Sequence, residues 1–506
     1  MKRLHIELQR VQTWLFAVPR LRAMVGANVL LGETLRADLP KLARETGRGW
    51  MLATAPQAYP RADADDPLKD HDNPADDAKA GILSRDGGHF EALFAAGAAG
   101  FADAASQLLR TRVPGLRFCI SIDEEPLTRS QAHLSTELPV LAPCEWTGRG
   151  LASEPIKQGK DEHHVSLDVA RRHEAARNAE GGNTKDIASL LSAKTKLPQL
   201  GPVQELQELV GNSYLALIHA DGNSVGAHAR RIDAEGERAA FFHENRVLLR
   251  RALKEPIDEA CDRDEPGKNE SPAPLVPLML GGDDLLLISR ARIALPFVVK
   301  LCEVLDSLQK SSTGFKLTLG VGVVIAKHTI PIHRLNEVVE QLASSAKRRF
   351  RGFVEVGEAK RSVVDWAVYS TAWVDDPDEM RRRDWLRGSG NNLRVLSQRP
   401  VDVLGRDIDS LQGLVDGAEK LKDAPRSQFR YLVDQLPRGR ALAELAFAEL
   451  PQEAKGPLAK AGVEEPWRVA GNASITPLLD LVEISEIARL GQRFERDSTK
   501  QEVVHV

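Results

Sequence analysis

The sequence predicts an α+β protein in which one β-α-β-β-α-β order of elements occurs twice and is followed by a helical region. Three observations support this prediction. Short β-type apolar runs alternate with long segments of helical periodicity in residues 1–123, and the same order returns in residues 213–373. From residue 374 onward the apolar periodicity is mostly helical. The chain has 506 residues, too many for one hydrophobic core, so about three or four domains are expected.

The first copy occupies residues 1–123. Its predicted elements are a strand, a long helix, two strands, a helix and a strand, over residues 3–7, 11–45, 49–55, 88–95, 98–113 and 116–124. An acidic, proline-containing loop at residues 61–80 lies between the two middle strands. This order is that of a ferredoxin-like domain.

Residues 124–212 interrupt the repeated order and predict a linker or small insert domain. They hold few strand signals and one helical stretch near residues 170–179. Cys144 lies in this segment together with three histidines, His163, His164 and His173. The histidines are more typical of a solvated helix than of a metal site, so we expect no zinc here.

The second copy occupies residues 213–373. Its strands are predicted over residues 214–220, 275–280, 285–289, 315–326 and 362–370, and its helices over 235–260, 294–310 and 332–350. Helices predicted over residues 411–421, 427–436, 440–450 and 476–490 form a C-terminal helical domain, residues 374–506.

The composition is that of a soluble globular protein, with 42% hydrophobic and 28% charged residues. The net charge of −4 argues against strong autonomous binding to nucleic acid, which needs a basic surface. The four cysteines are far apart and form no CxxC pair, which argues against a disulfide framework. The chain has neither a signal-peptide pattern nor an apolar run of about 18 residues, so we expect a cytoplasmic protein without a membrane span.

Carboxylates stand at two strand ends of the second copy. Asp221 ends the first strand, and Asp283 and Asp284 lie in the Gly-Gly-Asp-Asp turn between the second and third strands. In a ferredoxin-like unit the first strand lies beside this hairpin, so we expect the three side chains to approach one another. Ionised carboxylates share a small region only when cations neutralise them, and oxygen ligands suit Mg²⁺ or Mn²⁺. The sequence therefore predicts a two-metal site.

A second group of residues is expected to bind a nucleotide. Gly281 and Gly282 can take positive φ in a tight hairpin and let a phosphate approach the backbone. The loop from Gly222 to Gly226 leads into a helix N-terminus, which suits a triphosphate. The predicted nucleotide-binding residues are Gly222, Asn223, Ser224, Gly226, Gly281, Gly282 and Lys347.

Each of these signals has an ordinary structural alternative. Glycine and aspartate are common turn residues, so either acidic motif alone is typical of a turn. Two such motifs at the ends of adjacent strands favour the metal site. Lys347 could equally lie on a solvated helix face. The basic stretches 347–353 and 380–387 could bind RNA or a protein partner, although a solvated charged face is the simpler interpretation.

The motifs resemble a known family. Besides the Gly-Gly-Asp-Asp turn, they are "HADGNSVG", "LGVGVVIAKHTIPI" with its following helix ending "SSAK", "PVLAPCEWTGRG" and the N-terminal "VQTWLFAVPRLRAMVGANVLLGE". Together they are similar to the large polymerase/cyclase subunit of type III CRISPR–Cas effector complexes, in its Cmr-type branch. The specific motifs cluster in residues 214–350.

The resemblance implies two palm domains, of which the second makes cyclic oligoadenylate from ATP after guide RNA has captured target RNA. It implies other subunits of a Cmr-type complex as partners, and Asp221, Asp283 and Asp284 as metal ligands. Many relatives begin with an HD nuclease domain, whereas the His71-Asp72 pair here lies in the acidic loop. We therefore expect no DNA cleavage.

Two other functions are open. A dinucleotide cyclase related to diguanylate cyclases would carry a turn that reads Gly-Gly-Asp/Glu-Glu-Phe. Leu285 directly after Asp284, and the duplicated palm, argue against it. A scaffold that binds ATP or RNA without turnover is the non-enzymatic alternative, against which the intact acids argue.

Overall fold

The structure is a computed structural model that describes residues 1–55, 67–68, 74–85, 87–129, 142–158, 160–180, 187–198, 205–266, 270–311, 314–370 and 376–490. Two compact units make up the chain. Unit 1 comprises residues 1–208, 224–254 and 276–285, and unit 2 comprises residues 209–223, 255–275 and 286–506. The predicted α+β class is confirmed. His71 and Asp72, with most of the predicted acidic loop, lie outside the described residues.

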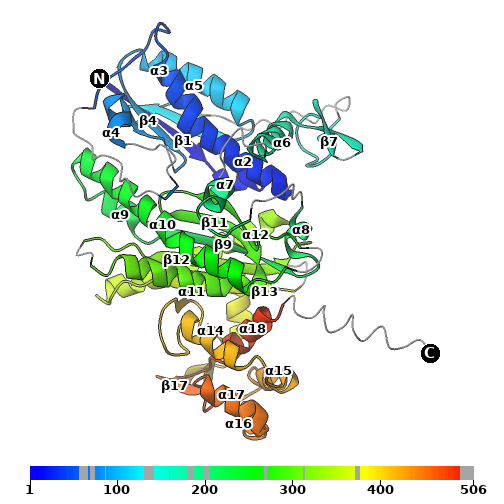
Figure 1. The fold of residues 1–506 in the computed structure, drawn as a ribbon. Helices are drawn as coiled ribbons and strands as arrows, with labels where there is room; N and C mark the ends of the chain where they lie inside the picture. The colour runs from blue at the N-terminus through cyan, green and yellow to red at the C-terminus, as the bar shows by residue number, and fades with distance from the viewer. Residues whose placement is uncertain are drawn as a thin grey trace. The chain divides into compact units, whose positions relative to one another are not determined.

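The sheet of unit 1 contains the adjacent strands β1 and β4 (Figure 1) and has the strand order predicted for a ferredoxin-like domain. Its order is β2-β4-β1-β5-β6, and a short strand β3 pairs with β4. The central strand β1 pairs antiparallel with both β4 and β5. The strands are β1 (Lys2–Gln9), β2 (Met51–Leu52), β3 (Ile82–Ser84), β4 (His89–Ala96), β5 (Arg117–Ile122) and β6 (Glu125–Arg129). The short strands β3 and β6 were not predicted.

The predicted helix over residues 11–45 is interrupted. It is divided into α1 (Val11–Leu15), α2 (Leu21–Glu33), the π-helical turn η1 (Thr34–Asp38) and α3 (Leu39–Arg44). The first break contains Pro19, whose ring disfavours helical backbone at the residue before it. The other helix of this copy, α5 (Ala98–Arg112), forms as predicted and buries Phe101 and Leu109 completely.

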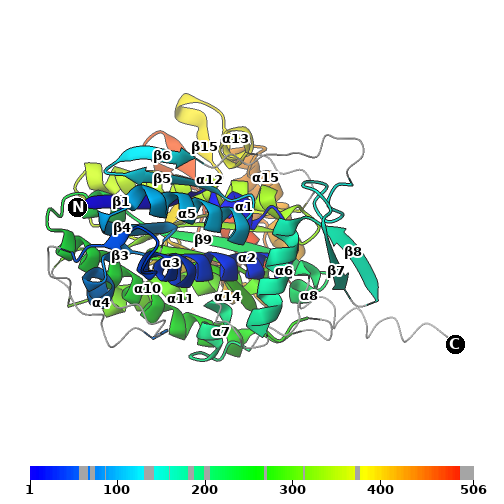
Figure 2. The same cartoon turned by 90° about the horizontal axis from the view of Figure 1, so that it is seen from above.

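The segment after the first sheet contains a hairpin of β7 (Glu154–Gln158) and β8 (Asp161–Val165), which was not predicted, beside the predicted helix α6 (Leu167–Glu180) (Figure 2). Helices α2 and α6 touch through their backbones, because a Cβ at Gly26 would lie 1.8 Å from the carbonyl oxygen of Arg172. The Arg172 side chain is fully buried and pairs with Asp168. It also donates hydrogen bonds to the carbonyl oxygens of Trp14 and Leu15. Two short helices follow, α7 (Ile187–Ser192) and α8 (Leu206–Val210).

The second sheet has the order β10-β11-β9-β12-β13-β16. Its first four strands again have the order expected of a ferredoxin-like domain. The central strand β9 pairs antiparallel with β12, and β12 pairs in parallel with β13. The strands are β9 (Tyr214–Gly222), β10 (Leu275–Leu280), β11 (Asp284–Arg290), β12 (Leu319–Lys327), β13 (Val363–Tyr369) and β16 (Val401–Asp402).

The helices of this copy are α9 (Val225–Ala229), α10 (Glu235–Arg263), α11 (Ala291–Leu308) and α12 (Ile332–Glu355). Helix α12 lies directly on the backbone of β12. A Cβ built at Gly322 would lie 2.3 Å from the Val339 carbonyl oxygen and 2.7 Å from the Ala343 nitrogen. Glycine is therefore required at this strand position, where any side chain would push the helix away from the sheet.

We predict that Gly322→Ala lowers the free energy of unfolding by about 1–3 kcal/mol, because the added methyl group overpacks the contact between β12 and α12. The matched control is Gly352→Ala within α12, where a Cβ would meet nothing within 4 Å. That variant should be neutral, or more stable by up to about 1 kcal/mol. Urea denaturation of both variants tests the prediction, and equal stabilities would contradict it.

The C-terminal region is mostly helical, as predicted. Its helices are α13 (Pro377–Met380), the π-helical turn η2 (Arg381–Trp385), the 3-10 turn η3 (Gly390–Asn392), α14 (Leu411–Lys420), α15 (Arg426–Gln435), α16 (Arg440–Ala448), α17 (Gln452–Lys460) and α18 (Leu478–Ala488). It also contains a small sheet of β14 (Leu386–Arg387), β15 (Leu393–Val395), β18 (Ala473–Ile475) and β17 (Arg468–Ala470), in that order. Strands this short carry no readable periodicity, so the sequence did not indicate the sheet. Within the described residues, no helix has the length and apolar character needed to span a bilayer.

A buried arginine joins α18 to β13 within unit 2. The fully buried Arg399 side chain donates hydrogen bonds to Asp480 at 2.9 Å and Glu483 at 2.8 Å. Its guanidinium group also lies over two indole rings, 4.5 Å from the centroid of Trp366 and 4.2 Å from that of Trp385. Two carboxylates and two aromatic faces thus replace the water that this cation loses on folding.

We predict that Arg399→Met lowers the free energy of unfolding by about 3–5 kcal/mol, because it leaves the buried Asp480 and the partly buried Glu483 without their cation. Arg430→Met is the control. Arg430 of α15 also pairs with a carboxylate of α18, Glu486, but this ion pair lies at the surface. Its loss should cost no more than about 1 kcal/mol. Urea denaturation followed by tryptophan fluorescence measures both, and equal costs would contradict the prediction.

Asp365 of β13 is a second fully buried charge in unit 2. It pairs with Arg381, which also donates a hydrogen bond to the Ser345 hydroxyl of α12 at 3.0 Å. One carboxylate oxygen of Asp365 has no hydrogen-bond partner among the described residues. Burial raises the pKa of Asp365 above its ordinary value, although the charge of Arg381 acts in the opposite direction.

The raised pKa of Asp365 predicts a pH-dependent contribution to stability. Between the pKa of the unfolded side chain, about 3.9, and the higher folded pKa, only the folded state holds this proton. The contribution is therefore complete below the unfolded pKa and is lost as the pH rises through the folded pKa. The unfolding free energy of Asp365→Asn relative to the wild type should thus increase from pH 4 upward. A difference that stays constant with pH in urea titrations would contradict this.

Candidate active site

The site is built at the end of β9. The antiparallel register with β12 places Asp221 opposite Gly320 and Gly222 opposite Leu319. Most of β9 is buried, whereas the Asp221 side chain is 33% exposed. The sheet thus places the Asp221 carboxylate where solvent reaches it.

Lys347 of α12 forms an ion pair with Asp221. Its ammonium group donates a hydrogen bond to Oδ2 of the carboxylate, and the lysine side chain is 27% exposed. The residues are 126 positions apart in sequence. We predicted that Lys347 contacts phosphate, but in this structure its partner is Asp221.

Gly320 provides the space for this pair. A Cβ at position 320 would lie 2.6 Å from Cγ of Lys347 and 3.0 Å from Oδ1 of Asn223. The lysine side chain therefore crosses the strand where no side chain stands. Sequence reasoning did not identify Gly320 as part of the site, and its only sign was the glycine pair in "LGVGVV".

Asn223 forms two hydrogen bonds with Thr318, and its side-chain oxygen accepts none among the described residues. Its backbone nitrogen donates to the Thr318 carbonyl oxygen at 2.8 Å, and its Nδ2 donates to the Thr318 hydroxyl at 3.2 Å. The residue is 2% exposed, and its Oδ1 has no hydrogen-bond partner within the part of the chain that the structure describes. A buried acceptor without a partner is costly, so this oxygen is available for a cation or a donor.

The loop between β9 and α9 is shorter than predicted, because β9 ends at Gly222 and α9 begins at Val225. Ser224 has φ +61°, a strained left-handed conformation for a residue with a side chain, and α9 begins at the next residue. Gly226 lies inside α9, and a Cβ there would make only an ordinary contact at 3.8 Å with Arg230. Phosphate binding by Gly222, Asn223, Ser224 and Gly226 stays a prediction.

The Gly-Gly-Asp-Asp turn belongs to unit 1. It is closed by a hydrogen bond of 2.7 Å from the Gly281 nitrogen to the Asp284 carbonyl oxygen. The expectation of positive φ was wrong, because neither Gly281 nor Gly282 has it. A Cβ at Gly282 would meet nothing within 4 Å, so space for a close approach to this backbone remains.

The residues at Asp221 fit a hard divalent cation by their chemistry. Asp221 offers a carboxylate and Asn223 an amide oxygen without a partner, which are the donors that Mg²⁺ and Mn²⁺ prefer. Among the residues described, no three His, Cys, Asp or Glu side chains are grouped so that they could hold a metal ion. Strands β9 and β11 are neighbours in the sheet, and the approach of Asp283 and Asp284 to Asp221 stays a prediction.

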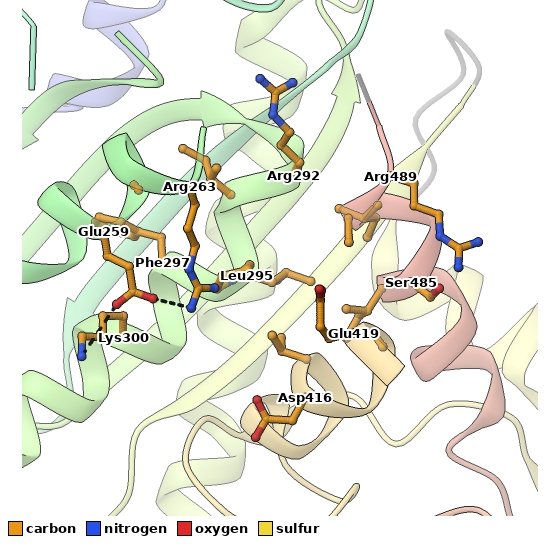
Figure 3. Close-up of a pocket in the computed structure, with 18 of the residues that line it drawn as sticks. Glu259, Arg263, Arg292, Leu295, Phe297, Lys300, Asp416, Glu419, Ser485 and Arg489 are labelled. Carbon is orange, nitrogen blue, oxygen red and sulfur yellow. Dashed lines mark ion pairs between the residues drawn. The ribbon is translucent and has the colours of Figure 1, made fainter. Parts of the chain in front are cut away.

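A pocket of about 470 Å³ lies elsewhere in unit 2, lined by residues of α10, α11, α14 and α18 (Figure 3). Three of its charged residues are paired with one another, since Glu259 pairs with both Arg263 and Lys300. None of the predicted site residues lines it.

The family of the second copy follows from a comparison with known protein families. The model of the Cas10/Cmr2 second palm domain matches residues 214–352, which extend from β9 into α12. This region is therefore similar to the second palm domain of Cas10/Cmr2 proteins. The predicted resemblance is thereby confirmed as that of a Cas10-like subunit, and the Cmr-type branch stays a prediction. The second palm contains Asp221, Asp283, Asp284 and Lys347.

Solved structures of Csm1 proteins are weakly similar to the chain. Csm1 of T. onnurineus aligns with a TM-score of 0.45 and 13% identity over 96% of this chain and 69% of that chain. A Csm1–Csm4 cassette in complex with pppApApA aligns with a TM-score of 0.45 and 12% identity over 96% and 69%. For the cassette in complex with AMPPNP the TM-score is 0.38 at 13% identity, over 69% of this chain and 53% of that chain.

The chain thus spans about half the length of the AMPPNP-bound relative, at 53%. Similarity at this level identifies no activity. Among curated proteins, no sequence matches this chain.

Proposed function

We propose that the second palm is a metal-dependent nucleotidyltransferase that makes cyclic oligoadenylate from ATP, as the signalling subunit of a type III CRISPR RNA-guided complex. The observation that carries the proposal is the Cas10/Cmr2 second palm at residues 214–352, with acidic residues at the ends of its strands. The solvent-accessible Asp221 and the unused side-chain oxygen of Asn223, two residues further along the chain, support a cation site.

In this proposal Asp221, Asp283 and Asp284 hold one or two Mg²⁺ or Mn²⁺ ions. When bound, the metal supplies positive charge that neutralises the phosphates and lowers the pKa of an attacking hydroxyl. The backbone of Gly281 and Gly282 lets the phosphates approach closely, and the loop from Gly222 to Gly226 binds the triphosphate. Lys347 adds a point charge on the phosphates.

The proposed reaction joins two ATP molecules. A ribose hydroxyl oxygen of one molecule attacks the α-phosphorus of the other, pyrophosphate leaves, and the hydroxyl proton goes to water. The residues listed for the phosphates contribute mainly by positioning, because in-line attack needs the reacting atoms about 3–3.5 Å apart. Repetition and ring closure would give the cyclic product.

The partners proposed for the chain are the other subunits of a type III complex, with guide RNA and target RNA bound through that complex. The negative net charge of −4 supports RNA binding through the assembly rather than by this chain alone. The basic stretches 347–353 and 380–387 do not oppose this, because several of their arginines are paired with aspartates.

We expect Asp283→Ala/Asp284→Ala to lower product formation from ATP by at least about 100-fold, since it removes two of three metal ligands. The assay incubates purified protein with Mn²⁺ and labelled ATP or GTP, alone and with type III partner subunits plus target RNA. Asp103→Ala, an exposed change on α5, is the control and should retain activity.

The products distinguish the candidate functions. Cyclic oligoadenylate that disappears in the double variant supports the proposal. A dinucleotide from GTP would favour a diguanylate cyclase-like enzyme instead. ATP binding without product in any condition would favour a scaffold.

A further inference from the structure

The ion pair between Lys347 and Asp221 is more specific than a surface contact. Both side chains are partly buried, at 27% and 33% exposure. The lysine reaches the carboxylate only because Gly320, the register partner of Asp221, carries no side chain. Helix α12, which holds the lysine, is fixed by its backbone contact at Gly322 and by the bond from Arg381 to Ser345.

The pair puts a cation on a carboxylate whose surroundings suit a metal. Asn223 Oδ1 also lies against the Gly320 position, at 3.0 Å from its Cβ, and has no hydrogen-bond partner among the described residues. Lys347 thus neutralises Asp221 while the neighbouring amide oxygen stays unsatisfied. An ammonium group carries one positive charge, whereas a divalent cation carries two and accepts both carboxylate and amide oxygens as ligands.

We propose that Lys347 is a counter-ion that occupies Asp221 in the absence of metal and moves to the nucleotide phosphates when metal binds. This inference rests on the proposed function. Without nucleotide, the positive charge of the displaced ammonium group repels the incoming cation. With nucleotide, the triphosphate accepts the lysine, so metal and nucleotide favour each other's binding. By thermodynamic linkage this coupling is reciprocal.

The test measures Mn²⁺ affinity directly by EPR on the purified full chain, with and without the ATP analogue AMPPNP. Lys347→Met keeps the apolar stem and removes the charge. We expect it to bind Mn²⁺ about three- to tenfold more tightly than the wild type without nucleotide. The gain in Mn²⁺ affinity that AMPPNP causes should fall by a similar factor, because the lysine no longer links the two ligands.

Gly320→Ala is a second variant that leaves the charge in place. Its methyl group would stand 2.6 Å from the lysine Cγ and 3.0 Å from Asn223 Oδ1. It should move Lys347 off Asp221 and tighten Mn²⁺ binding, by less than Lys347→Met does because the Asn223 oxygen is crowded as well. Circular dichroism verifies that this variant folds. Arg351→Met, an exposed change on the same helix, is the control and should bind Mn²⁺ like the wild type.

The outcomes separate the two proposals. If the wild type makes product but Lys347→Met binds Mn²⁺ no more tightly than the wild type, the counter-ion proposal alone is overturned. It is also overturned if Arg351→Met raises the Mn²⁺ affinity as much as Lys347→Met does, because the effect then follows from the loss of any positive charge on α12. If the wild type binds no Mn²⁺ even with AMPPNP, the metal site and the counter-ion proposal fall together.

Discussion

The pairing of β9 with β12 is the constraint on which the candidate site depends. The two strands form a continuous antiparallel register that ends with Asp221 opposite Gly320 and Gly222 opposite Leu319. A slip of the register by one residue would turn the Asp221 side chain to the other face of the sheet, and Gly320 would no longer lie opposite Asp221. The register therefore determines which carboxylate is presented and where the adjoining glycine leaves room for Lys347.

Charges are used in two ways in unit 2. The side chains of Arg399 and Asp365 are completely buried. Arg399 forms ion pairs with α18 and donates a hydrogen bond to the Trp366 carbonyl oxygen of β13. Asp365 of β13 forms an ion pair with Arg381. Such pairs specify one arrangement of the elements, since leaving either partner buried alone is costly. Asp221 and Lys347 are instead partly exposed, so each can exchange its partner at a modest cost in free energy.

The local pattern of the sequence predicted the repeated strand and helix order, because long apolar segments have clear periods of 2 or 3.6 residues. It did not predict the sheet formed by β14, β15, β17 and β18, whose strands have only two or three residues. It also predicted one continuous helix over residues 11–45, whereas Pro19 lies in a break between two helices. The prediction of positive φ at Gly281 and Gly282 was wrong, because this hairpin closes with negative or extended φ at both glycines.

The sequence by itself determined the two-fold repetition of the fold and the strand-end positions of Asp221 and the Gly-Gly-Asp-Asp turn. It also determined the similarity of residues 214–352 to the Cas10/Cmr2 second palm domain. These follow from local periodicity and short motifs, which need no knowledge of distant contacts. Only the tertiary structure decided that Lys347 meets Asp221, that Gly320 makes room for it and that Gly322 admits α12. These contacts join residues far apart in the chain, and they depend on strand register and helix placement, which packing of the whole core establishes.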